Sequence, residues 1–512
     1  MSSIHAVALL GAALFTCAFS VREAFAESSG GGGLTERMVV AAALKHNPTL
    51  AAAAGDLRRA QLLEQAEDHR YSVTLGLDGS ATRTRSPSLG VFGVTTPENT
   101  TYAAGAELSR HTVLGSDLKL RVEGWQVKST SSFLISQTTT PTQTTYSLGP
   151  GYGTSVKLSL TQPLLRGAGR DIYYANLDAA RVSQVSARSA RDQTASQLLL
   201  DVLTAFWELD YASRSVEIQK RAIEVATAQR DETALRVKTG SAAPVDVLSF
   251  ETNVATIEEE LATAQADQAV RAGELLRLMG DSELQIGSDT NTSVATPEPE
   301  LESTPGARES IRQRALSVSY ELAQQRAAVE LATVQARTAD ESYRPKLDLD
   351  AYVQAQGLGN RSLSPMYDQM TGLGAVSAHV GLAYQAPLDG TQRGAERERA
   401  LMAIETAKQR LTAIEQRVLA DLEKAVTREE SSRKRVGLAD ATLTIAKQQY
   451  EAEAQRFRTG SATALQVREA ENSVRNAELR ASRARADWVE SKLTLEHLSG
   501  KLLERWSKGG GE

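Results

Sequence analysis

The sequence contains a single cysteine, Cys17, and only six histidines among its 512 residues. Cys17 lies in an apolar segment near the N-terminus, and the histidines are scattered without the spacing of paired metal ligands. If the N-terminal segment is removed, the remaining chain has no thiol, which excludes disulfides and cysteine-based metal sites. The sequence therefore predicts no metal site and no cofactor.

Positive charge and aromatic residues are also scarce. The chain has 57 Lys and Arg against 63 Asp and Glu, a net charge of −6, so there is no basic patch for a nucleic acid partner. Aromatic residues make up 5%, which is low for a compact globular core and typical of long helices rich in small and charged residues. No run reaches the about 20 apolar residues of a transmembrane helix.

The N-terminus has the pattern of an export signal. An apolar run from Ala6 to Ser20 is followed by Ala24-Phe25-Ala26, a small-x-small cleavage pattern that predicts a signal peptide over residues 1–26. Thr16 before Cys17 is a poor fit to lipoprotein processing, although lipidation stays open. Residues 27–34 follow as a flexible tether.

The second half of the chain repeats the first. RVKTGSAAPVDVLSFE from Arg236 matches RFRTGSATALQVREAE from Arg456 at an offset of 220, and the match reaches Glu251/Glu471, Asp267/Asp487 and Gly280/Gly500. Residues 43–78 match 315–350 at an offset of 272. The difference means that the first copy carries about 52 extra residues between its matching parts.

Long helices surround the repeated turns. Apolar residues recur every three or four positions after Pro244, and the same spacing occurs after Ile404, as in coiled-coil seams. We expect one helix over 171–239, roughly 100 Å long at 1.5 Å per residue, and its counterpart over about 394–459. Each ends at a Thr-Gly-Ser turn, and return helices run from Pro244 to Gly280 and from Thr463 to about Trp506.

Between the helices, apolar residues alternate with polar ones, as in strands that face lipid on one side and water on the other. A soluble, half-buried sheet would give the same pattern, but the export signal and the long helices favour the membrane. Trp125 departs from the alternation, which leaves a bulge, an interfacial position or another register open. The expected strands are 71–85, 102–110, 117–128, 154–162, 346–356 and 377–386.

Six strands cannot enclose a pore, because about eight are the minimum, and open sheet edges are excluded from lipid. Several chains must therefore share one barrel. If instead the insert of the first copy lies outside the barrel wall, each chain contributes four strands.

Together these features resemble the TolC family of outer-membrane efflux proteins. The resemblance rests on ALKHNPTL at Ala43, TQPLL at Thr161, AFWEL at Ala205 and the two turn sequences at Arg236 and Arg456. It implies a mixed α and β membrane protein: a homotrimer with a shared β-barrel in the outer-membrane lipid and a long α-helical coiled-coil tunnel in the periplasm. Family protomers usually supply four strands, which gives twelve in the trimer, whereas six would give eighteen.

The resemblance also implies a function without catalysis. Family members are passive exit channels of tripartite efflux pumps or type I secretion systems, and they dock onto a periplasmic adaptor linked to an inner-membrane transporter. The expected location is the outer membrane of a Gram-negative cell. A structural or adhesive coiled-coil surface protein is the alternative, and the exported substrate cannot be read from the sequence.

Candidate site residues follow from the same resemblance. Gate candidates, where the family often has carboxylates near the closed periplasmic entrance, are Asp246, Gln466 and Glu469. Three Glu469 carboxylates around one axis would form a ring that attracts a cation, or Glu469 lies on a solvated helix face. Asp246 fits a gate lock or an ordinary first-turn carboxylate. Candidates for adaptor contact, which otherwise only reverse the chain, are Arg236, Thr239, Gly240, Ser241, Arg456, Thr459, Gly460 and Ser461.

The expected organisation has two structural repeats. The first covers 35–280, with strands over about 71–163 and a helical hairpin over about 171–280. After a linker at 281–305, the second covers 306–506, with strands over about 346–387 and a hairpin over about 394–506. Residues 507–512 form a C-terminal tail.

Overall fold

The structure is a computed structural model that describes residues 34–90, 93–95, 97–135, 142–240, 243–280 and 308–508. The predicted signal peptide and the linker at 281–305 lie outside these ranges, as do most of the tether and the end of the tail. The chain divides into a helical unit, comprising residues up to 56, 188–323 and 412 onward, and a sheet unit, comprising 57–187 and 324–411.

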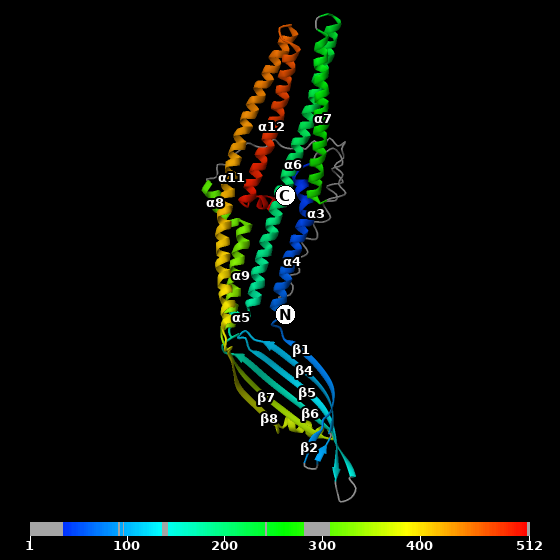
Figure 1. The fold of residues 1–512 in the computed structure, drawn as a ribbon, viewed down its shortest axis with the longest axis vertical. Helices are drawn as coiled ribbons and strands as arrows, with labels where there is room; N and C mark the ends of the chain where they lie inside the picture. Colours follow the sequence, from blue (N-terminus) through cyan, green and yellow to red (C-terminus); the bar gives the residue numbers. More distant parts are fainter. Residues whose placement is uncertain are drawn as a thin grey trace. The chain divides into compact units, whose positions relative to one another are not determined.

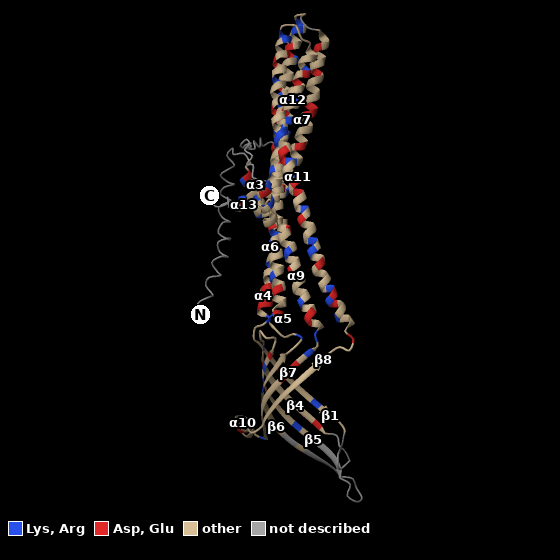
Figure 2. Ribbon diagram, turned by 90° about the vertical axis from the view of Figure 1, so that its left-hand side faces the viewer, with Lys and Arg blue, Asp and Glu red and all other residues tan. Residues whose placement is uncertain are grey.

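Long helices dominate the chain, and in the helical unit α6 with α7 and α11 with α12 form two hairpins (Figure 1). Acidic and basic residues are interspersed along these hairpins rather than gathered in one patch (Figure 2). None of the described helices is both long and apolar enough to span a membrane. The helices are α3 (Glu36–His46), α4 (Pro48–His69), α5 (Arg170–Tyr173), α6 (Ala175–Lys238), α7 (Pro244–Met279), α8 (Arg308–Val318), α9 (Tyr320–Tyr343), α10 (Ser364–Thr371), α11 (Thr391–Arg458), α12 (Ala464–Leu498) and α13 (Lys501–Lys508).

The internal repeat of the sequence is also a repeat of structure. Helices α3 and α8 begin and end at positions separated by the offset of 272, and so do the starts of α4 and α9. Helices α7 and α12 begin at positions separated by 220, where α6 and α11 have just ended. The two copies therefore share helix boundaries as well as motifs.

The core of the helical unit lies where α3, α6, α7, α11, α12 and α13 meet. Its largest fully buried side chains include Phe206 and Trp488, which are 0% and 1% exposed. Two indole N–H groups of this core have acceptors: Trp488 donates to Glu429 at 3.0 Å and Trp207 donates to Glu36 at 2.9 Å. Buried indole N–H groups usually find such acceptors. The buried N–H of Trp506, which packs against the same core, has no partner among the described residues.

Two of the predicted helices are interrupted, which corrects the sequence prediction. The helix expected over 171–239 breaks at Tyr174, where Tyr71, Tyr173 and Tyr174 form an aromatic cluster in the sheet unit. The return helix expected to reach Trp506 breaks at Gly500, whose φ of 70° ends α12 before α13 begins. Glycine adopts this left-handed conformation without the steric cost of a Cβ.

The sheet unit contains one antiparallel sheet of six strands in the order β1-β4-β5-β6-β7-β8. All six strands counted from the sequence are in it, so the insert of the first copy contributes to the sheet rather than lying outside it. The strands are β1 (Thr74–Arg85), β4 (Glu98–His111), β5 (Asp117–Ile135), β6 (Thr142–Pro163), β7 (Lys346–Asn360) and β8 (Val376–Gln385), with a separate hairpin of β2 (Ser88–Gly90) and β3 (Gly93–Thr95).

One face of the sheet is apolar from edge to edge. Register places Leu75, Leu108, Leu120, Leu158 and Val353 side by side on five successive strands. Their exposed fractions are 63%, 44%, 37%, 48% and 53%, although no described element covers them. Such an exposed apolar band, with charged residues on the opposite face, is the pattern of a lipid-facing barrel wall.

Two connections differ from the sequence prediction, and the structure also gives the position of Trp125. The loop expected over 129–153 is largely strand, because β5 and β6 continue past a bulge between Val127 and Ser129. Trp125 lies on the polar face and covers its cross-strand partner Gly153, where a Cβ would have no room. The loop expected between β7 and β8 contains helix α10, which packs on β7 through buried Met366.

Candidate functional site

The first hairpin turn joins α6 to α7. Gly240 has a φ of 79°, and the Thr239 hydroxyl donates to the Arg236 carbonyl at 3.0 Å. The guanidinium of Arg236 binds Glu232 one turn earlier, at 2.6 Å. Ser241 lies outside the described residues. The turn is therefore closed by the same residues that the sequence assigned to adaptor contact.

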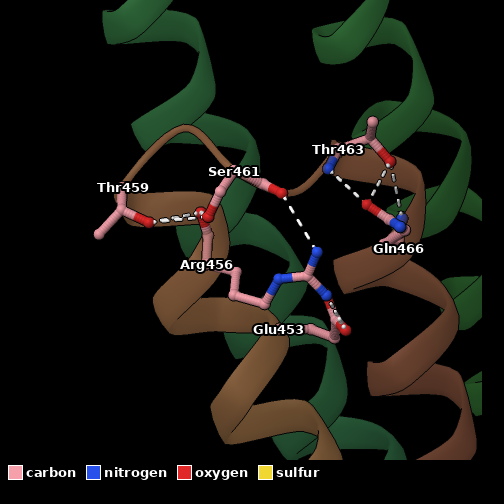
Figure 3. A network of polar contacts seen from close by, with 6 residues as sticks. All are labelled: Glu453, Arg456, Thr459, Ser461, Thr463 and Gln466. Atoms are coloured by element: carbon pink, nitrogen blue, oxygen red, sulfur yellow. Dashed lines mark hydrogen bonds and ion pairs between the residues drawn. The ribbon is translucent and has the colours of Figure 1, made fainter.

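The second turn, between α11 and α12, repeats this arrangement (Figure 3). Gly460 has a φ of 76°, and the hydroxyls of Thr459 and Ser461 donate to the Arg456 carbonyl at 2.9 and 3.0 Å. The Arg456 guanidinium donates to the Ser461 carbonyl at 3.4 Å and to Glu453 at 2.9 Å. Arg456 thus stabilises its own turn through both its carbonyl and its guanidinium.

The two turns contact each other through Arg236. Its guanidinium donates to the Phe457 carbonyl at 3.4 Å and lies 5.0 Å from the centre of the Phe457 ring. Phe250 of α7 packs at 6.5 Å against the same ring, edge to face. A second link runs from Arg468 of α12 to the Ser249 hydroxyl at 3.0 Å. The structure therefore brings the predicted tip residues of both copies into one cluster.

The three gate candidates have different local roles. The Asp246 carboxylate accepts a hydrogen bond from the Ala243 N–H at 3.2 Å and so caps α7. Gln466 forms a capping box with Thr463: the Thr463 N–H donates to the side-chain oxygen Oε1 of Gln466 at 2.8 Å (Figure 3). Glu469 is exposed on α12 and has no hydrogen bond or ion pair with the residues that the structure describes. The Glu469 carboxylate is therefore available to a neighbouring chain.

A buried carboxylate lies two residues beyond Glu469. Glu471 is 7% exposed, and neither carboxylate oxygen has a hydrogen-bond partner among the described residues. Burial raises the pKa of Glu471 from its usual 4.5 to about 7, against the opposing charge of Arg475. The repeat equivalent, Glu251, is exposed on α7. The sequence had paired these two glutamates but gave no signal that only one of them is buried.

An ionic network crosses the core of the helical unit. Glu208 of α6 accepts hydrogen bonds from Arg483 of α12 on both oxygens, at 2.8 and 2.9 Å, and pairs with Arg271 of α7 at 3.3 Å. Arg483 also binds Asp487 at 2.8 Å. Burial and the neighbouring Glu208 raise the pKa of Glu490 to about 7. Sequence reasoning missed this network, although Glu208 lies in the AFWEL motif and Asp487 in the repeat.

The polar face of the sheet carries its own charge cluster. Arg121 of β5 lies between three carboxylates: Asp78 at 2.9 Å, Glu123 at 3.1 Å and Glu107 at 3.6 Å. Lys157, the cross-strand partner of Arg121 on β6, adds a second positive charge beside the three carboxylates. No group of His, Cys, Asp or Glu in the described part of the chain has the arrangement of a metal site.

The fold and these sites agree with a family comparison. The model of the family described as outer membrane efflux protein matches residues 126–281 and 311–501, more than half of the chain. The chain belongs to this family. Outer membrane efflux proteins are channels rather than enzymes, and the family places the chain in the outer membrane. No curated protein sequence matches the chain.

Solved structures of outer membrane channels share the fold. The chain is 18% identical to the outer membrane protein VceC of Vibrio cholerae, with a TM-score of 0.62 over 91% of this chain and 96% of that one. It is 12% identical to the CmeC channel of Campylobacter jejuni, with a TM-score of 0.62 over 92% and 89% of the two chains. It is 16% identical to the MtrE channel of Neisseria gonorrhoeae in its open state, with a TM-score of 0.61 over 91% of this chain and 89% of that one. The TolC-like fold expected for this efflux protein is thereby confirmed.

Proposed function

We propose that the chain is the outer-membrane exit channel of a tripartite efflux pump or a type I secretion system. Three copies would form one passive channel, and the turns at Gly240 and Gly460 would receive a periplasmic adaptor linked to an inner-membrane transporter. The two structural repeats, 35–280 and 306–506, supply the two hairpins of each copy.

The observation that carries this proposal is the pairing of two features in one chain. The sheet exposes a band of apolar residues that only lipid or another chain can cover, and its far face is charged. The helical hairpins end in two similar turns, each closed by a glycine with positive φ and joined by Arg236 to Phe457. A membrane-inserted wall and paired, rigid docking ends are what an exit channel for a periplasmic partner needs.

The test is single-channel recording from the purified, detergent-extracted protein in planar bilayers, with the oligomer mass measured on the same sample. We expect discrete pores from a trimer. A soluble monomer without pores would overturn the proposal and favour a coiled-coil spacer protein instead.

The adaptor contact needs its own experiment. Gly240 and Gly460 variants carrying a bulky side chain should still form pores in the bilayer but lose export in cells. Arg58→Ala, on exposed helix α4, is a control that should keep both. Unchanged export by both turn variants would exclude these turns as the docking ends.

A further inference from the structure

The sheet of a single chain ends in two edges that need a partner. Among the described residues, β1 pairs only with β4 and β8 pairs only with β7. The apolar residues of the edge strands are more exposed than those inside the sheet: Leu77 and Val380 are 75% and 74% exposed, against 37% for Leu120. In lipid, unpaired backbone N–H and C=O groups along such edges cost several kcal/mol each.

Neither edge strand contains proline or lysine, two of the features that prevent pairing in soluble sheets. Natural edge strands are commonly blocked by proline, lysine, inward charges or bulges. Strand β8, VSAHVGLAYQ, has no proline and no Asp, Glu, Lys or Arg, and β1, TLGLDGSATRTR, has no proline or lysine. The one acidic residue of β1, Asp78, is on the polar face, where it binds Arg121. Both edges are therefore suited to continue the sheet.

The direction and the faces of the two strands fit each other. All five pairings between β1 and β8 are antiparallel, so β1 and β8 run in opposite directions, and β8 of one copy can pair antiparallel with β1 of the next. Leu75 and Leu77 lie on the apolar face of β1, and Val380 and Leu382 lie on that of β8. Pairing with these residues on the same side extends the apolar band without interruption.

We propose that three copies of this chain join β8 of one to β1 of the next and close an eighteen-stranded barrel. One copy cannot close on itself, because six strands are fewer than the smallest barrel. The number of copies rests on the trimer of the proposed function, whereas the six strands per copy come from the sheet itself. Twelve strands, four per copy, would require two strands of this continuous sheet to leave the wall.

The extra strands widen the exit. Barrel diameter grows roughly linearly with strand number, so eighteen strands give about 1.5 times the diameter of twelve, and barrels of this size hold an open aqueous channel. The wall would present Arg121 and its three carboxylates three times to that channel. This width would let bulkier cargo pass the membrane part of the duct.

Cysteine cross-linking of the purified full-length protein tests the edge pairing. The only cysteine, Cys17, lies in the predicted signal peptide, so the processed chain gives a background without thiols. Single cysteines at positions 75, 77, 79 and 81 of β1 are each combined with Val380→Cys in β8. Within one chain these edges are five strand spacings apart, roughly 24 Å along the sheet, so any disulfide must join two copies.

Two controls make the outcome readable. In the first, His379→Cys replaces Val380→Cys, which places the thiol on the opposite face of β8. In the second, Leu108→Cys with Leu120→Cys places two thiols on adjacent residues of β4 and β5, which must form a disulfide within one chain if the sheet is folded. Oxidised samples are resolved by mass under denaturing conditions.

We expect at least one of the four apolar-face pairs to give covalent dimers and trimers but nothing larger, and the opposite-face control to give none. Absence of cross-links from all four pairs, while the β4–β5 control forms its disulfide, would overturn the eighteen-stranded barrel. If that sample still forms trimers and pores, the proposed exit channel stands, but its barrel is not closed by pairing β8 with β1. A covalent series that stops at the dimer would instead assign twelve strands from two copies and overturn the inference.

Discussion

The guanidinium of Arg236 lies 5.0 Å from the ring centre of Phe457 and joins the end of α6 to the end of α11. Among the described residues, its repeat equivalent, Arg456, binds within its own hairpin, to Glu453 and Ser461. The two arginines therefore have different contacts at matching positions. Arg236 links the two hairpins, and Arg456 stabilises the turn of its own hairpin. This difference supplies a matched pair of variants.

Arg236→Gln should loosen both hairpin ends, because a cation over an aromatic ring at an exposed site contributes about 0.5–1 kcal/mol. Amide hydrogen exchange should rise near Val237 and near Phe457. Arg456→Gln should raise exchange only in the second turn. Equal effects of the two variants on α6 would contradict a linking role for Arg236.

The buried Glu471 predicts a pH dependence of stability. Its pKa is raised from 4.5 to about 7 in the folded chain, so the unfolded chain releases this proton at lower pH. Stability should therefore fall as pH rises from about 4.5 to 7, by up to about 3 kcal/mol for a shift of this size, and then level off.

Glu471→Gln removes that titration. The variant should unfold at a higher temperature than the wild type at pH 8 and at the same temperature at pH 5, measured by circular dichroism of the helices. Glu251→Gln, at the exposed repeat position, should match the wild type at both pH values. A wild type and a Glu471→Gln variant that keep the same difference at both pH values would rule out this assignment.

Glu208 predicts a cost in core stability. Glu208→Gln leaves Arg483, which is 39% exposed, with a weaker partner, and we expect a loss of roughly 2 kcal/mol, below the full value for a buried pair because solvent reaches the arginine. The control is Glu274→Gln, which breaks an exposed pair with Arg277 and should cost about 0–1 kcal/mol. Chemical denaturation of the purified protein compares the two variants, and equal losses would contradict a role of Glu208 in core stability.

Glu469 predicts an electrostatic effect on the channel. If three copies bring this carboxylate to one axis, Glu469→Ala should lower cation selectivity and weaken block by divalent cations in planar bilayers. Gln466→Glu, one turn earlier on α12, should strengthen the block. Conductance and block that stay unchanged in both variants would place Glu469 on an ordinary solvated face.

Two glycines predict different costs for the same substitution. Gly280 has a φ of 70°, and a Cβ there would lie 2.6 Å from the His46 carbonyl oxygen, whereas Gly240 has a φ of 79° and open space around it. Gly240→Ala should cost about 1–2 kcal/mol of backbone strain, and Gly280→Ala should cost clearly more because α3 must also move. Thermal unfolding of the two variants measures the difference. Equal losses of stability in the two variants would mean that α3 can move away from position 280 without a cost in free energy.

Much of the fold was readable because the chain contains its own repeat. The turns at Gly240 and Gly460, the helix starts at Pro244 and Ala464, and the six strands all follow from local patterns and from the offsets. Helix ends at glycine and apolar alternation in strands are local signals, and local signals survive without tertiary information.

The site was less readable, because its contacts join residues far apart in the chain. The link from Arg236 to Phe457 and the pairing of Glu208 with Arg483 depend on how helices pack, which periodicity does not give. The unequal burial of Glu251 and Glu471 shows the same limit, since identical residues at matching positions have different surroundings. The extensions of β5 beyond residue 128 and of β6 before residue 154 were missed because their polar sequences look like loop.

The glycines that follow α7 and α12 occupy the same sterically restricted position in both copies of the repeat. Gly280 and Gly500 share a φ of 70°, and a Cβ on either would lie 2.6 Å from the end of the preceding short helix, at His46 or at Val318. His46 and Val318 are themselves repeat equivalents that have diverged in chemistry, while the glycines facing them have not. The two copies of this junction therefore differ in the residue at the end of the short helix. Both keep glycine at the position where any larger residue would clash with that helix.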